Sequence, residues 1–242
     1  MPEEIKQSTL DFIALYNRQL SEEKQIAVQH FLDAIGYTEQ DGIYSKMEYM
    51  ILPIMSTNLT DATFEIVSGE RKELVNDTGA SFSDGALTGV SNTLFTYADQ
   101  SSLNPRECSQ IAVVAGQSIN NMKVLNGSTL TWFTQGGSNF GARTLVSAAF
   151  QGIWANTGSK SMVFTISETD STVELVTNGT QVGNTVNAEN FISATGETLT
   201  NRVALISNNS IYCIGATKEP LTSLESKKFN DAMDALVTAL AI

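Results

Sequence analysis

The stretch MVFTISETDSTVELVTNG, residues 162–179, decides the fold of this chain. Two short runs rich in β-branched and apolar residues, Met162–Ser167 and Val173–Thr177, flank a cluster of Ser, Thr, Asp and Glu. This pattern is typical of two strands joined by a turn. The dipeptide Asn178-Gly179 then follows the second run, and it favours the two-residue turn of a β-hairpin. The stretch therefore predicts consecutive antiparallel strands.

The same pattern of short apolar runs separated by turn-forming residues extends over the middle of the chain. Short apolar runs alternate there with clusters of Gly, Asn, Asp and Ser, and such a series of short strands predicts an all-β sandwich or barrel instead of alternating βα units. We expect an antiparallel β-sandwich over residues 41–216. Its further strand candidates are Thr63–Val67, Gln110–Ala115, Thr129–Thr134, Thr144–Phe150, Val203–Ile206 and Ser210–Ile214.

Amphipathic helices are expected near both ends of the chain. In the segment 1–40, Ser21 is a good N-cap residue, Glu22 and Glu23 suit the positive end of a helix dipole, and Gly36 supplies the stop. A shorter helical segment, from Leu10 to Leu15, precedes this helix.

The segment 217–242 also has the features of an amphipathic helix with a capped N-terminal end. Thr222 and Glu225 form the Thr-x-x-Glu pattern of a capping box. Apolar residues then recur at helical spacing from Phe229 to Leu240. We expect one domain, in which the N-terminal helical segment packs on the sandwich or links it and the C-terminal helix is part of the same domain. Helices outside a sandwich can cover sheet edges or dock into a neighbouring molecule.

The composition fits a folded, acidic protein. Of the 242 residues, 42% are hydrophobic and 17% are charged, which is enough apolar material for a core and too little charge for a disordered chain. The formal net charge of −12 argues against nucleic acid and acidic membrane surfaces as partners. The start, MPEEIKQSTL, lacks the apolar stretch of a signal peptide, and no apolar run approaches the ~20 residues that span a bilayer. We expect synthesis in a cytoplasm and no membrane insertion.

The two cysteines, Cys108 and Cys213, are too few for a disulfide framework or a zinc site. They leave two alternatives, a single bridge or two buried free thiols. Free cysteine is among the most buried residue types, which favours the second.

The most suggestive chemical pattern is Glu168, Asp170 and Glu174. Concanavalin-like glycosidases carry Glu-x-Asp-x-(x)-Glu on one strand, and retaining hydrolysis needs two carboxylates at ~5 Å separation. In this chain the last gap is one residue too long, and residues 167–171 have the composition of a turn. We therefore expect solvated carboxylates and no enzyme.

Other polar residues give no chemical constellation. His30 is the only histidine and lies on the N-terminal helix, where a partly buried position on the helix face is expected. Four aspartates in predicted loops lack the dense spacing of a calcium loop, so turn chemistry is the expected role and no metal site or cofactor is predicted. They are Asp61, Asp77, Asp84 and Asp99.

Three aromatic side chains are candidates for contact with glycan or protein, namely Trp132, Phe140 and Trp154. Trp132 and Phe133 are adjacent on one predicted strand, so their side chains point to opposite faces of the sheet. One of the two then belongs to the core, and the other is exposed or lies in an interface. Core packing is the alternative role for all of these aromatics.

Several stretches, in this order along the chain, resemble a family of phage-encoded virion proteins with a laminin-G or concanavalin A-like jelly-roll domain. The stretches are LSEEKQIAVQHFLDAIGYTEQDGIYSKMEYMILPIM (20–55), FSDGALTGV (82–90), FGARTLVSAAFQGIWANTGS (140–159), FTISETDSTVELVTNGTQVG (164–183) and CIGATKEPLTSLESKKFNDAMDALVTAL (213–240).

The resemblance implies a structural component of a bacteriophage particle, either a head decoration or head fibre, or a tail or collar appendage. It further implies other virion proteins as partners, a homo-oligomer and location in the virion. It carries no catalytic residue over to this chain. The alternative function is a lectin-like module that binds a cell-surface glycan for host attachment, and a more remote one is a degenerate glycosidase.

Overall fold

The computed structural model describes residues 3–75, 78–90, 93–96, 107–114, 122–126, 129–136, 139–146, 149–155, 161–167, 169–170, 172–177, 180–182, 201–205 and 210–240. Of these, residues 75, 93–96, 122–155, 180–182 and 201–205 are described by their backbone only. The helices are α1 (Gln7–Ala14), α2 (Glu22–Ile35) and α3 (Ser223–Leu240), with short 3-10 helices η1 (Tyr44–Lys46), η2 (Pro53–Met55) and η3 (Asp61–Thr63).

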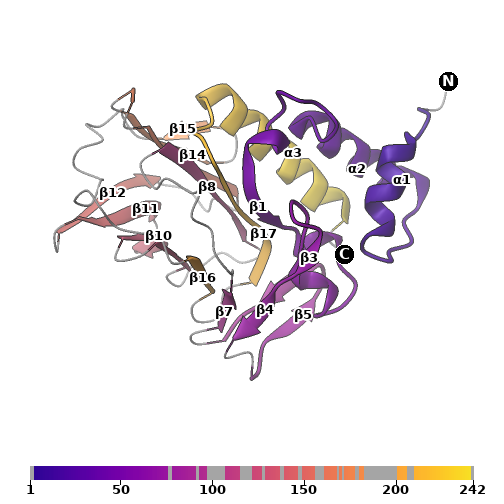
Figure 1. The fold of residues 1–242 in the computed structure, drawn as a ribbon, viewed down its shortest axis with the longest axis horizontal. Helices are drawn as coiled ribbons and strands as arrows, with labels where there is room; N and C mark the ends of the chain where they lie inside the picture. The colour runs from indigo at the N-terminus through magenta and orange to yellow at the C-terminus, as the bar shows by residue number, and fades with distance from the viewer. Residues whose placement is uncertain are drawn as a thin grey trace.

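Two antiparallel sheets lie in layers within the described part of the chain (Figure 1). The first runs in the order β15-β14-β13-β8-β17-β1-β2-β3, and the small β5–β6 hairpin joins it through pairing of β6 with β17. Its strands are β1 (Met47–Ile51), β2 (Phe64–Glu65), β3 (Glu70–Arg71), β5 (Ser81–Ser83), β6 (Ala86–Thr88), β8 (Glu107–Val114), β13 (Ser161–Ser167), β14 (Thr172–Thr177), β15 (Thr180–Val182) and β17 (Ser210–Thr217).

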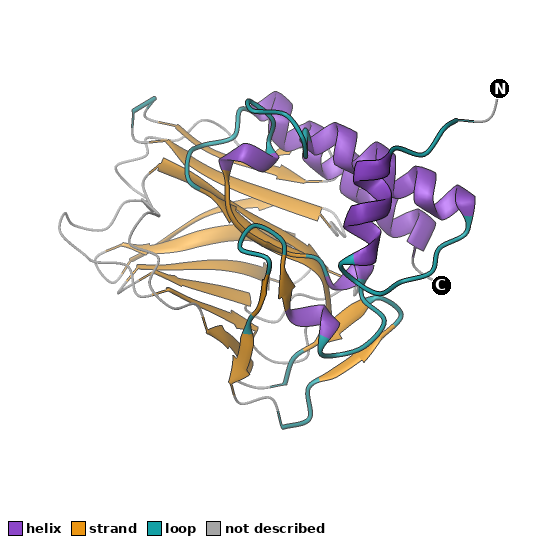
Figure 2. Cartoon of the chain, turned by 45° about the vertical axis from the view of Figure 1, so that its right-hand side comes forward, coloured by secondary structure: helices purple, strands orange, loops and turns teal. Residues whose placement is uncertain are grey.

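The second sheet runs in the order β12-β11-β10-β9-β16-β7-β4. Its strands are β4 (Glu73–Val75), β7 (Thr93–Thr96), β9 (Met122–Asn126), β10 (Thr129–Gly136), β11 (Asn139–Val146), β12 (Ala149–Ala155) and β16 (Asn201–Leu205). The helices gather on the side of the first sheet that faces away from the second one (Figure 2).

The antiparallel β architecture with terminal helices is confirmed, and most predicted strands lie where they were expected. The predicted strand Thr144–Phe150 is wrong, because the chain turns back inside it. Val146 of β11 pairs with Ala149 of β12, so the segment spans a hairpin. The antiparallel strands predicted for residues 162–179 are confirmed, since β13 pairs with β14 and Thr177 of β14 pairs with Thr180 of β15.

The central strands β8, β13 and β17 of the first sheet are buried on both faces, whereas β3 at its edge is exposed. Every residue of β13 is buried, and its apolar side chains divide between two apolar clusters. Phe164 and Ile166 belong to the cluster on the inner side, to which Leu74 of the second sheet also contributes. Val163 points the other way and belongs to the cluster that contains the helices.

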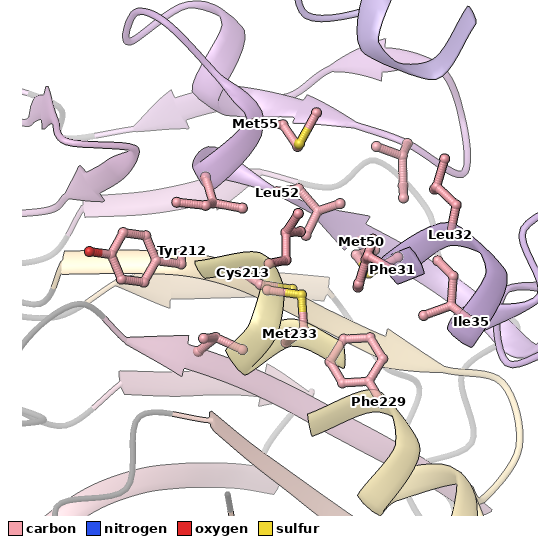
Figure 3. Packing of buried hydrophobic residues seen from close by; sticks show 14 of the residues in the cluster. Phe31, Leu32, Ile35, Met50, Leu52, Met55, Tyr212, Cys213, Phe229 and Met233 are labelled. Atoms are coloured by element: carbon pink, nitrogen blue, oxygen red, sulfur yellow. The ribbon is translucent and has the colours of Figure 1, made fainter. Parts of the chain in front are cut away.

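The outer cluster is closed by the helices (Figure 3). Phe31 of α2 and Phe229 of α3 meet edge to face, with ring centroids 6.2 Å apart, and Met233 reaches down beside Cys213 of β17. Tyr16, just after α1, packs edge-on against Phe64 at 5.4 Å. Each fully buried side chain of this size contributes about 1.5–3 kcal/mol of burial free energy, so the helical layer is a large part of the core. The helices therefore cover a face of the first sheet.

Buried hydroxyl groups fix the chain as it enters α3. The Ser109 hydroxyl accepts a hydrogen bond from the Leu221 backbone N–H at 2.8 Å and lies 2.6 Å from the Thr165 hydroxyl. The backbone N–H of Ser109 donates to the Thr217 hydroxyl at 2.8 Å. These bonds satisfy polar groups inside the packed layer and set where the helix begins.

The predicted capping box at the start of α3 is confirmed. The Thr222 backbone N–H donates to Glu225 Oε2 at 2.8 Å, and the Glu225 N–H donates back to the Thr222 hydroxyl at 3.2 Å. Lys46 Nζ lies 2.8 Å from Glu225 Oε1. Burial raises the pKa of Glu225, but the hydrogen bonds from Lys46 and Thr222 outweigh it and leave the pKa lowered.

The predicted stop of α2 at Gly36 is confirmed, whereas the predicted cap at Ser21 is confirmed in position only. Gly36 ends the helix in the left-handed conformation with φ of 62°, as expected, and its Cα would be 2.8 Å from a Cβ placed on Gly42. Ser21 occupies the N-cap position, but its side chain makes no capping hydrogen bond. The first backbone N–H groups of α2 are therefore left without a side-chain acceptor from Ser21.

The two cysteines are free and buried. Cys108 belongs to the inner cluster and Cys213 to the outer one, so the sheet separates the two thiols. Burial, reinforced by the charge of Glu107 and partly opposed by a hydrogen bond with Gln110, raises the pKa of Cys108 to about 12. Burial also raises the pKa of Cys213. Of the two alternatives from the sequence, the structure has two buried free thiols.

We predict that the protein loses stability as pH rises above about 9. In the unfolded chain the two thiols ionise near 9.0, and Tyr16 and Tyr49 near 10.0, whereas burial in the folded protein raises the pKa of all four groups. The folded state then binds more protons than the unfolded state, so the free energy of unfolding falls, by at most about 1.4 kcal/mol per pH unit and group. Urea denaturation between about pH 7 and pH 11 measures this, and a flat profile would contradict the burial of these groups.

Candidate functional site

The three aromatic candidates lie on neighbouring strands of the second sheet. Trp132 is on β10, where its backbone pairs with Arg143, while Phe140 is on β11 and Trp154 on β12. The pairing of Trp154 with Gly141 joins the last two strands. The side chains of these residues lie outside the described part of the structure. Their role in contacting glycan or protein stays a prediction.

Two of the three suggestive carboxylates line one polar pocket of about 300 Å³, next to the start of α3. Glu174 on β14 has its two carboxylate oxygens 2.7 and 2.8 Å from the Ser223 hydroxyl, the first residue of α3. Asp170 accepts a hydrogen bond at 3.1 Å from the hydroxyl of Ser167, and its own N–H lies 3.2 Å from that oxygen. Glu168 lies outside the described residues.

These hydrogen bonds give the carboxylates a structural role. Asp170 is exposed in the turn between β13 and β14, as expected, and its bonds to Ser167 close that turn. Glu174 lies on a strand and holds the N-terminal end of α3, where the helix dipole favours a negative charge. Among the residues that the structure describes, no group of three or more His, Cys, Asp and Glu could hold a metal ion.

Three other predicted positions have structural contacts. His30 is exposed and pairs with Glu3 at 3.0 Å, so the expectation of a partly buried histidine is wrong, because it lies on the outer face of α2. Asp61 is buried and accepts hydrogen bonds from Asn58 and from Arg71, the latter at 2.8 Å. Asp84 lies at the tip of the β5–β6 hairpin. Asp77 and Asp99 lie outside the described residues.

An apolar groove of about 550 Å³ runs between α2 and α3 and was not predicted from the sequence. Small side chains line both of its walls, and Phe31 lies between them. The groove residues that form these walls are Ala27 and Ala34 on α2 and Leu224, Ala232 and Ala235 on α3.

Exposure makes this groove a candidate for binding. Leu224 is 76% exposed, the largest exposure among the large apolar side chains that the structure describes. An apolar groove on a soluble protein marks a binding surface more often than a scattered apolar residue does. The polar side chains at its rim belong to His30, Lys227, Lys228 and Asp231. Lys227 and Asp231 pair with each other at 2.7 Å, and His30 pairs with Glu3.

A sequence signal for the groove exists, but it is weak. Ala27 and Ala34 are seven residues apart on α2, and Ala232 and Ala235 are three apart on α3, so each pair lies on one helix face. Alanine at such positions is also a common filler of helix surfaces. Only the packing of α2 against α3 brings the two pairs together.

Comparison with known proteins gives a fold and no family. No protein-family model and no curated protein matches this chain. The structure is similar to the Trypanosoma rangeli sialidase in complex with sialic acid, with a TM-score of 0.53 and 10% identity over 88% of this chain and 39% of that one. It is also similar to domain 4 of AbnA, an extracellular arabinanase from Geobacillus stearothermophilus in complex with arabinotriose. There the TM-score is 0.54 and the identity 11%, over 77% of this chain and 98% of that domain. At these identities the likeness shows the fold alone.

We predict that Glu174→Ala destabilises the protein by about 0.5–1.5 kcal/mol, because it removes a hydrogen-bond acceptor at the start of α3. Urea denaturation measures the change, and Glu73→Ala, which removes an exposed glutamate on β4, is the control. Substitution of a carboxylate that serves ligand binding or catalysis usually raises the stability of the protein. An unchanged or increased stability of the Glu174 variant would therefore contradict the anchoring role.

Proposed function

We propose that this chain is a non-enzymatic structural component of a bacteriophage particle, attached to a neighbouring virion protein through the groove between α2 and α3. It acts as a head decoration, a head fibre or a tail or collar appendage. Its two sheets form a jelly roll of the laminin-G or concanavalin A-like type, which projects from the attachment point. The observation that carries the proposal is the exposed apolar groove with Leu224 at its end.

The occupant that fits this groove is an amphipathic helix of the neighbouring protein. Small side chains on both walls let a third helix approach closely, at the 8–10 Å spacing of packed helices. Lys228 at the rim favours a partner helix with acidic flanks. Burial of Leu224 in such a contact would contribute about 1.5–3 kcal/mol.

The position of the groove supports attachment through the helical layer. Both described chain ends lie on the helical side of the molecule, and the second sheet lies on the opposite side (Figure 1). A contact at the groove would leave the second sheet free to face outward. The ordered resemblance of five stretches to phage virion proteins supports the same assignment.

A second candidate function is glycan binding by the exposed sandwich, which is compatible with the first. The observation that favours it is the likeness to the arabinanase domain, since this chain aligns with nearly all of a domain that was solved with arabinotriose. The aromatic residues of the second sheet, Trp132, Phe140 and Trp154, would be the contacts. A glycan array tests this function, and signals that persist in Trp132→Ala and Trp154→Ala variants would contradict these contacts.

We predict that Leu224→Asp reduces incorporation into phage particles at least about tenfold, because it puts a charge into an apolar contact. Its free energy of unfolding should stay within about 0.5 kcal/mol of the wild type, as Leu224 is exposed in the isolated chain. Quantitative immunoblotting of purified particles measures incorporation.

The matched control is Leu10→Asp, which changes a leucine on α1 that is 39% exposed and lies outside the groove. It should be incorporated like the wild type. Absence of the wild-type chain from purified particles would contradict the virion assignment. Equal incorporation of the Leu224 and Leu10 variants would contradict attachment through the groove.

A further inference from the structure

A second pocket, of about 550 Å³, lies where three segments that are distant in the sequence meet. The first segment is the connection from Arg18 to the first turn of α2. The second is Ser56–Thr57, directly after η2, and the third is the tip of the β5–β6 hairpin at Asp84-Gly85. In contrast to the groove, this pocket is lined largely by polar side chains.

The hairpin tip forms a firm wall of the pocket. Asp84 and Gly85 have φ values of 50° and 74°, the left-handed pair that a two-residue type I′ turn requires. The turn packs so closely on η2 that a Cβ on Gly85 would be 2.7 Å from Ile54 Cδ1 and 3.4 Å from Ile54 Cα. The tip is therefore held against the backbone beside the pocket.

Arg18 supplies a cation that has no carboxylate partner among the described residues. Its guanidinium is partly buried and donates one hydrogen bond to the Ile54 carbonyl oxygen. Burial lowers the pKa of Arg18 from its ordinary value, which reflects the cost of holding this charge away from water. The remaining N–H groups of the Arg18 guanidinium are available to donate hydrogen bonds to an anionic ligand.

Ser56 lines the same pocket and has a buried hydroxyl group. The residue is 3% exposed, and its Oγ has no hydrogen-bond partner among the described residues. Buried polar groups in proteins are almost always hydrogen-bonded, because a buried donor or acceptor without a partner costs free energy. A bound ligand could supply the missing hydrogen-bond partner of the Ser56 hydroxyl.

The N-terminal end of α2 adds further positive potential. Ser21 and Lys24 line the pocket, so the Lys24 ammonium is a second cation beside Arg18. Asp84 is the one carboxylate among the lining residues. Glu22 and Glu23 belong to the same helical turn but do not line the pocket. Two cations against one carboxylate favour a ligand with a single negative charge.

We propose that this pocket binds a carboxylate-bearing monosaccharide unit, such as a uronic acid of a surface glycan. Its carboxylate would contact Arg18, Lys24 and the Ser56 hydroxyl. The partly buried Phe82 offers a wall for the sugar ring, and Asp84 accepts hydrogen bonds from ring hydroxyls. The volume exceeds what a bare inorganic anion fills. This inference goes beyond attachment through the groove and does not depend on it.

The test is binding of sodium glucuronate to the full-length chain by titration calorimetry, with methyl glucoside and inorganic phosphate as the other ligands. We expect saturable binding of glucuronate, none of the glucoside, and at least about tenfold weaker binding of phosphate. Absence of glucuronate binding overturns the proposal. Equal binding of the glucoside, or of phosphate, overturns the assignment to an acidic sugar.

The decisive variant is Ser56→Ala. Because the hydroxyl has no partner among the residues that the structure describes, we expect no loss of thermal stability, whereas glucuronate should bind about three- to tenfold more weakly. The matched control is Ser226→Ala, which removes another buried, unpartnered serine hydroxyl, on α3 and outside this pocket. It should bind glucuronate like the wild type. Wild-type affinity in the Ser56 variant would overturn the proposed site.

Discussion

The structure depends on one constraint, which is that both faces of the central strands of its first sheet must be covered from water. Strand β13 is buried at every position, and residues on either side of it enter two separate apolar clusters. The second sheet covers one face and the helices cover the other (Figure 2). The helical layer is therefore part of the core. Without it, side chains such as Ile111, Val163 and Cys213 would be exposed.

This constraint also explains where the candidate sites lie. Because α2 and α3 must both pack on the sheet, they lie side by side, and their small side chains leave an apolar groove on the outer surface. The connection into α2 must pass over η2, which brings Arg18 to the Ile54 carbonyl and to the buried Ser56. Both sites are consequences of how the helical layer is attached. The polar network around Ser109 fixes the start of α3 in the same layer.

Local chemistry made much of the fold predictable, whereas the sites needed contacts between distant residues. The capping box at Thr222, the stop at Gly36 and the hairpin after Thr177 follow from neighbouring residues. The β11–β12 turn was missed because Thr144–Phe150 is mostly apolar and contains no Gly, Asn or Pro. The two-sided burial had a signal, since MVF at residues 162–164 and IAVV at residues 111–114 lack the alternation of a half-exposed strand. No local pattern links Arg18 with Ser56 and Asp84.

Native-state hydrogen exchange at increasing denaturant tests most directly whether the helical layer belongs to the core. The backbone N–H groups of α3 should exchange only with global unfolding, with the same free energy and denaturant dependence as those of β8 and β13. Exchange of α3 through a separate opening of lower free energy, while the two strands stay protected, would contradict the account. The helices would then be an appended segment, and neither the groove nor the pocket beside α2 would have a fixed shape.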